Sequence, residues 1–309
     1  PSVVCSKNSA IHKLLLQILM RKLLFVFSCL LLFGLQSCAP DYFEDKRSEL
    51  VVEGWIEDNR PPVVILSKTL TLSDKYQSLT DLKDYIVTWA KVSVSDGVDT
   101  VVLTGKYDPE YFPPYVYTTG RMFGRVGATY TLMVEYEDIY ATAETRILPS
   151  PVMENMRVVR SEDSDSLYQI EITMRDESPE KDYYQVFTKT GTSSKQFFAS
   201  YLGYFTDDVI IDGTFIPVFR GKSAMDEDYT PYFKENDSVS VKIAHIDNGA
   251  YEFWSTYSKN VNMPSSMFLT AISRVPSNIS GALGYWCGMG SLRKNIVISE
   301  HLMNGNSSK

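Results

Sequence analysis

Histidine and cysteine, the usual sources of nucleophiles, bases and zinc ligands, are scarce in this chain. A zinc site needs three or four ligands from cysteine, histidine and carboxylate at workable spacing. His245 lies in an alternating segment and His301 near the end of the sequence, so both are expected to be structural or surface residues. Cys287 and His245 as a nucleophile pair are one alternative. However, Cys287 lies in an apolar run, where cysteine is ordinarily a small buried residue.

Carboxylate clusters are the second group of chemistry-bearing residues. They occur at Glu162–Asp165, at Asp207, Asp208 and Asp212, and at Asp226–Asp228. Calcium prefers six to eight oxygen ligands, but no cluster has the EF-hand order, and solvated acidic loops explain them equally well. Paired carboxylates for glycoside hydrolysis stay open, because the fold sets their spacing. The chain also lacks the nucleophile elbow, the phosphate-binding glycine loop and the metalloprotease helix. We therefore expect no enzyme, no metal and no cofactor, with calcium as the open alternative.

An aromatic and proline-rich segment is the strongest recognition signal. Residues Tyr107–Tyr117 contain five aromatic residues and three prolines in an expected loop, and Tyr229–Phe233 is similar. Tyrosine offers amphipathic contact area at low entropic cost, which suits a binding surface. The candidate ligand or partner contacts are Tyr111, Phe112, Tyr115 and Tyr117. The alternative is that these rings cap the ends of a β-sandwich.

The segment Met20–Cys38 has the layout of a secretory signal. Arg21 and Lys22 precede the apolar run Leu23–Leu35, which is short beside the roughly 20 residues that span a bilayer. The last four residues, Leu-Gln-Ser-Cys, resemble a bacterial lipobox, in which the cysteine becomes the acylated N-terminus. We expect residues 1–19 to be a mis-annotated upstream extension, 20–37 a lipoprotein signal peptide, and 38–48 a lipidated tether.

Cys38 is accordingly the predicted lipidation site, carrying palmitate-type acyl chains. Each buried CH₂ adds about 0.8 kcal/mol of membrane affinity, so the partner here would be the outer-membrane lipid bilayer. Ala39 in place of an aspartate after the cysteine favours the outer membrane, and the leaflet stays open. The alternative is a plain secretory signal that is cleaved elsewhere.

The net charge and the number of cysteines limit the kinds of partner and cross-link that the protein can have. Removing residues 1–37 takes away four basic residues and no acidic one, which leaves 26 basic and 38 acidic residues, a net charge of −12. Such a surface disfavours nucleic acid. Cys5 and Cys29 would be lost with the signal, so no intramolecular disulfide is expected.

Alternating apolar residues predict a mainly β fold. In the first half the expected strands are Leu50–Ile56, Val63–Leu66, Lys91–Ser95, Thr100–Leu103, Tyr130–Tyr136 and Tyr140–Ile147. Asp96-Gly97 is a strong hairpin signal. These strands predict an N-terminal Ig-like β-sandwich over 49–149, ending where Pro149 and Pro151 resist sheet pairing.

The second half is expected to form a second β-rich domain over 150–299, followed by a flexible tail at 300–309. Its strands are predicted at Tyr168–Met174, Tyr183–Thr188, Gln196–Tyr201 and Val239–Ile246. One short helix follows, because Asp247–Gly249 offers an N-terminal cap and Tyr251, Trp254 and Tyr257 recur at helical spacing. Met263-Pro264 is expected to end it.

Several short motifs resemble a Bacteroidetes outer-membrane lipoprotein family, the domain of unknown function 4249. They are Leu50–Ile56, Val63–Ser67, Ala90–Val94, Gly127–Leu132, Asp182–Tyr184 and Asn278–Tyr285. The likeness covers residues 38 to about 299, with Gly281-Ala282 where the family pattern has Gly-Gly. It implies an accessory role beside a TonB-dependent β-barrel transporter and carries over no active site.

We therefore expect a non-enzymatic outer-membrane lipoprotein that helps a TonB-dependent transporter to capture or take up its ligand. The first alternative is an independent surface module that binds a glycan or a peptide. The second alternative is an acid-based hydrolase.

Overall fold

The computed structural model describes residues 49–69, 83–176, 178–191, 195–211, 214–222, 229–262 and 274–299. The expected extension, signal peptide, Cys38 and tether lie outside the described residues. So do His301, Asp212, the cluster at 226–228, Met263-Pro264 and the tail at 300–309.

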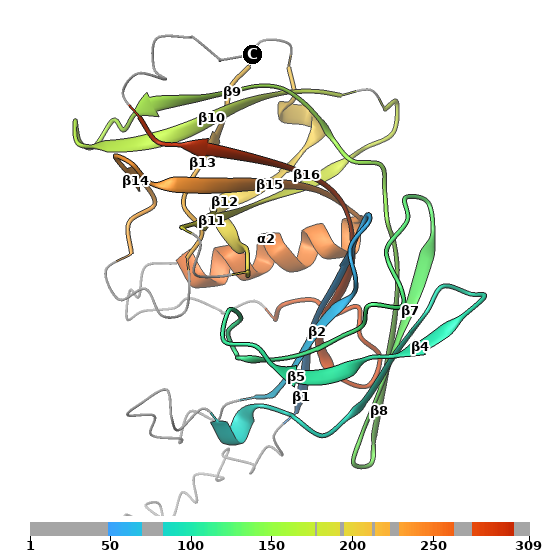
Figure 1. Cartoon of the computed structure of the whole chain (residues 1–309). Coiled ribbons are helices and arrows are strands. Elements are labelled where there is room, and N and C mark those ends of the chain that lie inside the picture. The colour runs from blue at the N-terminus through green and yellow to red at the C-terminus, as the bar shows by residue number, and fades with distance from the viewer. Residues whose placement is uncertain are drawn as a thin grey trace, which may run out of the picture. The chain divides into compact units, whose positions relative to one another are not determined.

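The mainly β fold is confirmed: within the described residues, three sheets accompany one α-helix (Figure 1). The first-half strands are β1 (Leu50–Glu57), β2 (Val63–Lys68), β3 (Lys91–Ser95), β4 (Thr100–Val102), β5 (Thr104–Tyr107), β6 (Tyr115–Thr118), β7 (Thr129–Tyr136) and β8 (Ile139–Arg146). The others are β9 (Val152–Arg160), β10 (Leu167–Arg175), β11 (Tyr183–Thr190), β12 (Phe198–Thr206), β13 (Ile216–Val218), β14 (Phe233–Lys234), β15 (Ser238–Ile246) and β16 (Leu283–Val297). The helix is α2 (Asn248–Asn262).

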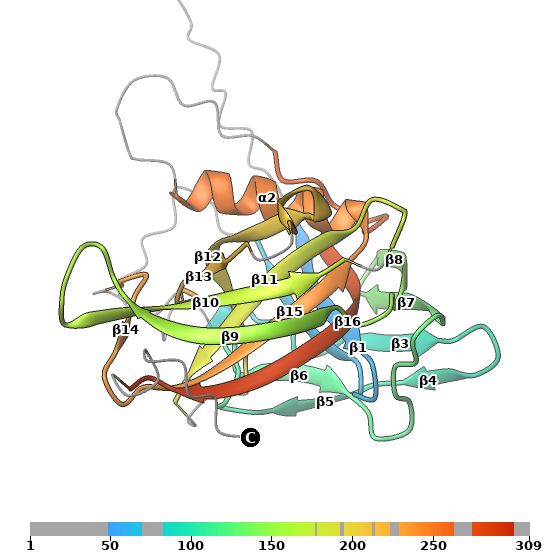
Figure 2. The ribbon, with the colours of Figure 1, turned by 90° about the horizontal axis from the view of Figure 1, so that it is seen from above.

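The largest sheet has eight strands in the order β12-β11-β15-β16-β1-β2-β6-β5. A sheet of order β4-β3-β7-β8 packs on its β1 and β2 end, and the resulting sandwich includes β16 as well as strands from the predicted range 49–149. The third sheet, in which β10 pairs with β9, β13 and β14, packs on the β11 and β15 end. Figure 2 looks down on β9 and β10, which lie over β11, β15 and β16.

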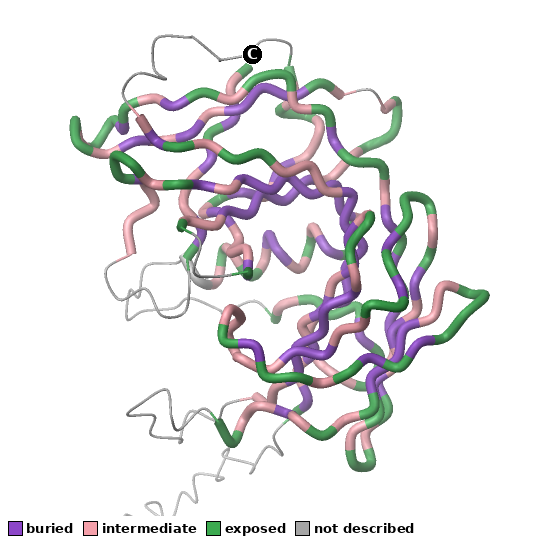
Figure 3. The backbone as a smooth tube through the Cα atoms, viewed as in Figure 1, coloured by how far each residue is buried: buried purple, intermediate pink, exposed green. Residues whose placement is uncertain are grey.

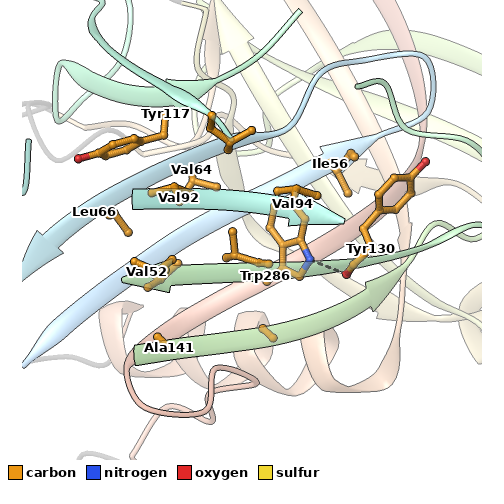
Figure 4. Close-up of a cluster of buried hydrophobic side chains, with 14 of the residues drawn as sticks. Val52, Ile56, Val64, Leu66, Val92, Val94, Tyr117, Tyr130, Ala141 and Trp286 are labelled. Carbon is orange, nitrogen blue, oxygen red and sulfur yellow. Dashed lines mark hydrogen bonds between the residues drawn. The ribbon is translucent and has the colours of Figure 1, made fainter. Parts of the chain in front are cut away.

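The first core lies between the two sheets of the sandwich (Figure 4). Alternate residues of β1, such as Val52 and Ile56, point into it, as strand geometry requires. Trp286 from β16 fills its centre, and its indole N–H donates to the carbonyl oxygen of Tyr130 at 3.0 Å. Figure 3 shows that buried residues follow the strands, whereas the hairpin tips are exposed.

β16 joins the two halves of the chain, and no strand was predicted there. It pairs with β1 in parallel and with β15 in antiparallel orientation. The first core includes Ile279 and Trp286 from beyond the predicted boundary at 149 and 150, and the eight-stranded sheet also crosses it. Whether residues 49–149 form an independent domain stays a prediction.

Helix α2 starts where the sequence predicted. The Asp247 carboxylate accepts a hydrogen bond from the Ala250 N–H at 2.7 Å, which is an N-terminal cap. The helix packs on the face of the large sheet away from β9 and β10 (Figure 1). No helix in the described part of the chain is long and apolar enough to cross a bilayer.

Candidate binding cavities on the large sheet

A cavity of about 360 Å³ lies on the face of the large sheet that is turned away from both cores. Since Val52 and Ile56 of β1 point into the first core, their neighbours Glu53, Trp55 and Glu57 point into this cavity. The other lining residues come from strands that pair around β1 and from nearby loops and the helix: Arg60, Pro61, Val63, Tyr111, Phe187, Lys189, Lys195, Phe197, Lys242, Trp254, Tyr285, Met289 and Arg293. We call it the first cavity.

A buried ion cluster forms part of the lining of the first cavity. Lys242 Nζ lies 2.9 Å from Glu57 Oε1, and Arg293 Nη2 lies 2.5 Å from Glu57 Oε2. Only 5% of the Lys242 side chain and 2% of the Glu57 side chain are exposed. Burial alone would raise the pKa of Glu57, but the two cations outweigh it and lower that pKa to about 2. Burial lowers the pKa of Lys242, and the attraction of Glu57 opposes that shift.

Cations surround the ring of Phe197 beside this cluster. The charged groups of Arg293, Lys242 and Lys189 lie 4.7, 5.2 and 5.5 Å from its centroid. Lys242 also lies 4.3 Å from the ring centroid of Phe187. Cations within about 6 Å of an aromatic face are attracted to it. The two rings therefore hold part of the cavity's positive charge in place.

Glu53 is the second acidic residue of the first cavity, and unlike Glu57 it has no cationic partner among the described residues. Its burial raises its pKa to about 7, although the Tyr285 hydroxyl donates to it at 3.2 Å. Glu53 and Glu57 lie four residues apart on one strand, a Cα separation of about 13 Å. Glycosidase carboxylates lie about 5 to 9.5 Å apart. The two glutamates therefore lack the spacing of a hydrolytic pair.

A second cavity, also of about 360 Å³, adjoins the first and shares Glu53, Phe197 and Trp254 with it. Amides and further rings form much of its lining, among them Phe112, Pro113, Gln185, Gln196, Tyr229 and Tyr257. Rings with a few hydrogen-bonding groups are typical of small-molecule sites. The two neighbouring cavities are therefore treated together as the candidate site.

The four predicted contact residues lie in the loop 108–114 between β5 and β6 and in β6 itself, and they point in different directions. Tyr111 lines the first cavity and Phe112 the second. Tyr115 packs against the first core instead, and Tyr117 is only 2% exposed and donates its hydroxyl to Val87 O at 3.1 Å. Strand alternation explains this split, because β6 turns Tyr115 and Tyr117 to the core face. Two of the four predicted contact residues therefore line the first or the second cavity, and Tyr115 and Tyr117 line a separate surface hollow beside Trp89 and Lys91.

Hydrogen bonds fix this loop to the segment that leads into β12. Gln196 Oε1 accepts from the Phe112 N–H at 2.9 Å, and Glu110 O accepts from the Lys195 N–H at 3.0 Å. Lys195 Nζ also lies 3.2 Å from Asp108 Oδ2. The loop is thereby held against the rim of both cavities.

The candidate nucleophile and base lie apart. Cys287 is fully buried beside α2, and burial raises the pKa of its thiol well above the usual value. His245 lies on the opposite face of the sheet, with Nδ1 2.9 Å from Pro149 O and Nε2 3.3 Å from Asp182 Oδ1. The two side chains therefore form no catalytic pair. Among the described residues, no His, Cys, Asp or Glu group has the arrangement of a metal site.

Sequence reasoning missed Glu53, Glu57, Lys242 and Arg293 as site residues. One signal was available, since Lys242 interrupts the apolar run of β15, where an unpaired lysine is rarely buried. The partner of Lys242 could not be read from the sequence, because Glu57 precedes it by 185 residues.

The model of a protein family described as Domain of unknown function (DUF4249) matches residues 39–295. This range includes strands of all three sheets and both cavities. Among curated proteins, no sequence matches this chain.

Proposed function

The chain belongs to the DUF4249 family, and we propose that it is a non-enzymatic ligand-binding lipoprotein that assists a TonB-dependent transporter. In this proposal Cys38 is acylated and anchors the protein to the outer membrane. The two cavities capture a small ligand, and the loop 108–114 contacts the transporter.

The adjoining pair of aromatic-lined cavities is the observation that carries the binding role. Each has the volume of an ordinary small-molecule site. Tyr111 and Phe112 are neighbours in a loop at the rim, and their side chains are half-buried. Half-buried rings at a rim suit contact with a ligand or with a partner that delivers it.

The test is to recover tagged, lipidated protein from gently solubilised outer membrane and to identify its partners by mass spectrometry. We expect a TonB-dependent barrel in stoichiometric amount. Recovery of the protein alone would contradict the accessory role and favour the independent glycan- or peptide-binding module. A Cys38→Ser variant should leave the membrane fraction, and continued retention there would contradict lipidation at this residue.

The loop assignment needs a narrower change than removal of the whole aromatic segment, because Tyr115 and Tyr117 pack in the core. The double variant Tyr111→Ala and Phe112→Ala should weaken recovery of the barrel. Tyr107→Ala is the matched control, because Tyr107 is 69% exposed and lines neither cavity. Equal recovery with both variants would contradict contact through this loop.

An acid-based hydrolase is the second candidate, and one observation favours it. A glutamate with a pKa of about 7 has the acidity of a general acid. The spacing to Glu57, the only other acidic residue among the described residues that line the two cavities, opposes the idea, because the Cα atoms of the two glutamates lie roughly 13 Å apart on one strand. Turnover of a glycan by the purified protein, lost in Glu53→Gln, would establish it.

A further inference from the structure

The first cavity is basic although the protein is acidic. The chain has a formal net charge of −8, yet the first cavity is lined by five cationic residues and two acidic ones. The cations are Arg60, Lys189, Lys195, Lys242 and Arg293, and the acids are Glu53 and Glu57. Charge of one sign gathered in a hollow attracts ligands of the other sign.

Carboxylates neutralise only some of the cationic residues that line the first cavity. Glu57 lies between Lys242 and Arg293, and Lys195 pairs with Asp108 and Glu110. Arg60 and Lys189 differ, since no carboxylate of the described residues lies within ion-pair distance of either. Their two positive charges are therefore available to a ligand.

Two residues of the same lining each carry a buried hydrogen-bond donor. Trp254 Nε1 and Arg293 Nε are buried and have no acceptor among the described residues. A buried donor without an acceptor costs about 1–3 kcal/mol. Both atoms are closed to solvent, so they lie behind the surface of the cavity and the ligand assignment does not depend on them.

Aromatic rings form the apolar wall of the first cavity. The rings of Trp55 and Tyr111 lie 6.4 Å apart, and those of Trp254 and Tyr285 lie 5.1 Å apart. Rings at such distances offer flat apolar faces beside their polar groups. A ligand that matches them carries a flat or ring-shaped apolar surface.

We propose that the first cavity binds a small ring compound that bears a carboxylate, either a sugar acid or an aromatic acid. The carboxylate meets Arg60 and Lys189, and the ring lies against the tryptophan and tyrosine side chains. A volume of about 360 Å³ suits a compound of one or two rings or the end of a longer chain. This assignment rests on the proposed binding function and names the ligand class of that site.

Tryptophan fluorescence provides the measurement. Trp55 and Trp254 line the first cavity, Trp286 lies in the first core, and Trp89 is 88% exposed. Trp89→Phe therefore removes a background signal that reports on neither the first nor the second cavity. The probes are sodium glucuronate and sodium benzoate, with glucose and benzyl alcohol as neutral counterparts.

We expect a saturable change with at least one of the two carboxylates and a response at least tenfold weaker with its neutral counterpart. Glucuronate alone identifies the sugar acid, and benzoate alone identifies the aromatic acid. The carboxylate response should also weaken as sodium chloride is raised, because salt screens charge attraction. Equal response to charged and neutral probes, or no response to any of them, would overturn the proposal.

A pair of double variants locates the charge. Arg60→Gln with Lys189→Gln should weaken binding of the carboxylate at least tenfold. Arg121→Gln with Lys294→Gln removes the same charge from exposed positions outside the cavities. This control should change the binding of the carboxylate less than twofold. Equal loss in both double variants would contradict recognition through Arg60 and Lys189.

This measurement separates the two proposals, because purified protein needs no transporter. Carboxylate binding without a barrel in the pull-down would contradict the accessory role and support the ligand class. A barrel in the pull-down with no response to the probes would support the accessory role and contradict the ligand class.

Discussion

Lys242 is the residue whose surroundings depend most on a distant part of the chain. Its ammonium group is almost fully buried and bonds to Glu57, which lies on a strand 185 residues earlier. Burying two charges is costly, and removing one of them leaves the other uncompensated. The Glu57–Lys242–Arg293 cluster therefore contributes specificity more than net stability.

Lys242→Met should lower the free energy of unfolding by about 3 kcal/mol or more, because Glu57 keeps only Arg293 as a partner. Urea unfolding at pH 7 measures the change. Lys91→Met is the matched control, since the Lys91–Glu135 pair is about half exposed and should be worth less than about 1 kcal/mol. Equal effects of the two variants would contradict a buried charge pair.

Glu53 should make stability depend on pH in the opposite sense to an ordinary acidic residue. Its pKa is about 7 in the folded protein against an ordinary 4.5. Between these values the folded state binds more protons than the unfolded state, so stability falls as pH rises. The loss amounts to at most about 3 kcal/mol.

Glu53→Gln should remove this loss. Urea unfolding at pH 5, 6, 7 and 8 should show the variant gaining stability relative to the native protein as pH rises. A difference that stays constant across the four pH values would show that Glu53 titrates normally.

At the scale of elements, β16 is the strand that the sequence pattern did not predict. Strands such as β1, β3 and β7 alternate apolar and polar residues, and the sequence predicted them well. β16 carries Gly284, Gly288 and Gly290 on one face, and glycine is depleted in strands. Glycine is required at these positions because the backbones of neighbouring segments come too close for a side chain. The residues that allow β16 to pair are therefore ones that do not predict a strand.

Gly284→Ala tests this close approach. Gly284 has a φ of +112°, and a Cβ there would lie 1.9 Å from Val52 O. We expect a loss of at least about 2 kcal/mol in the free energy of unfolding, because the strand must shift away from β1. Gly120→Ala is the control, since its Cβ would meet nothing within 4 Å. A denaturation midpoint that is the same in both variants would contradict the assignment.

At the scale of the whole molecule, the pairing of distant segments limits what the sequence could predict. Strands β1, β2, β3, β7 and β8, the helix and its cap follow from local patterns, whereas β16, which completes the first sandwich, does not. The candidate site does not, because Glu57, Lys242 and Arg293 meet only after β1, β15 and β16 have paired. The aromatic segment was recognisable by composition, but the strand that divides its rings between core and cavity was not.

The isolated segment 49–150 should not fold cooperatively, because it lacks β16 and with it Trp286, which fills the first core. Urea unfolding and dispersion of its amide proton resonances, compared with those of 49–299, give the measurement. A dispersed spectrum with a sharp transition from 49–150 alone would instead establish the domain boundary predicted from the sequence.

The position of β16 also determines the order of events when the chain folds. Glu53 and Tyr285, which bond across the β1–β16 pair, are 232 residues apart. Closing so long a loop is entropically slow, and proteins dominated by such contacts fold slowly. Until β16 arrives, β1 and β15 each present an open edge, and open edges recruit other chains. Newly made protein should therefore be prone to aggregation until β16 has been synthesised.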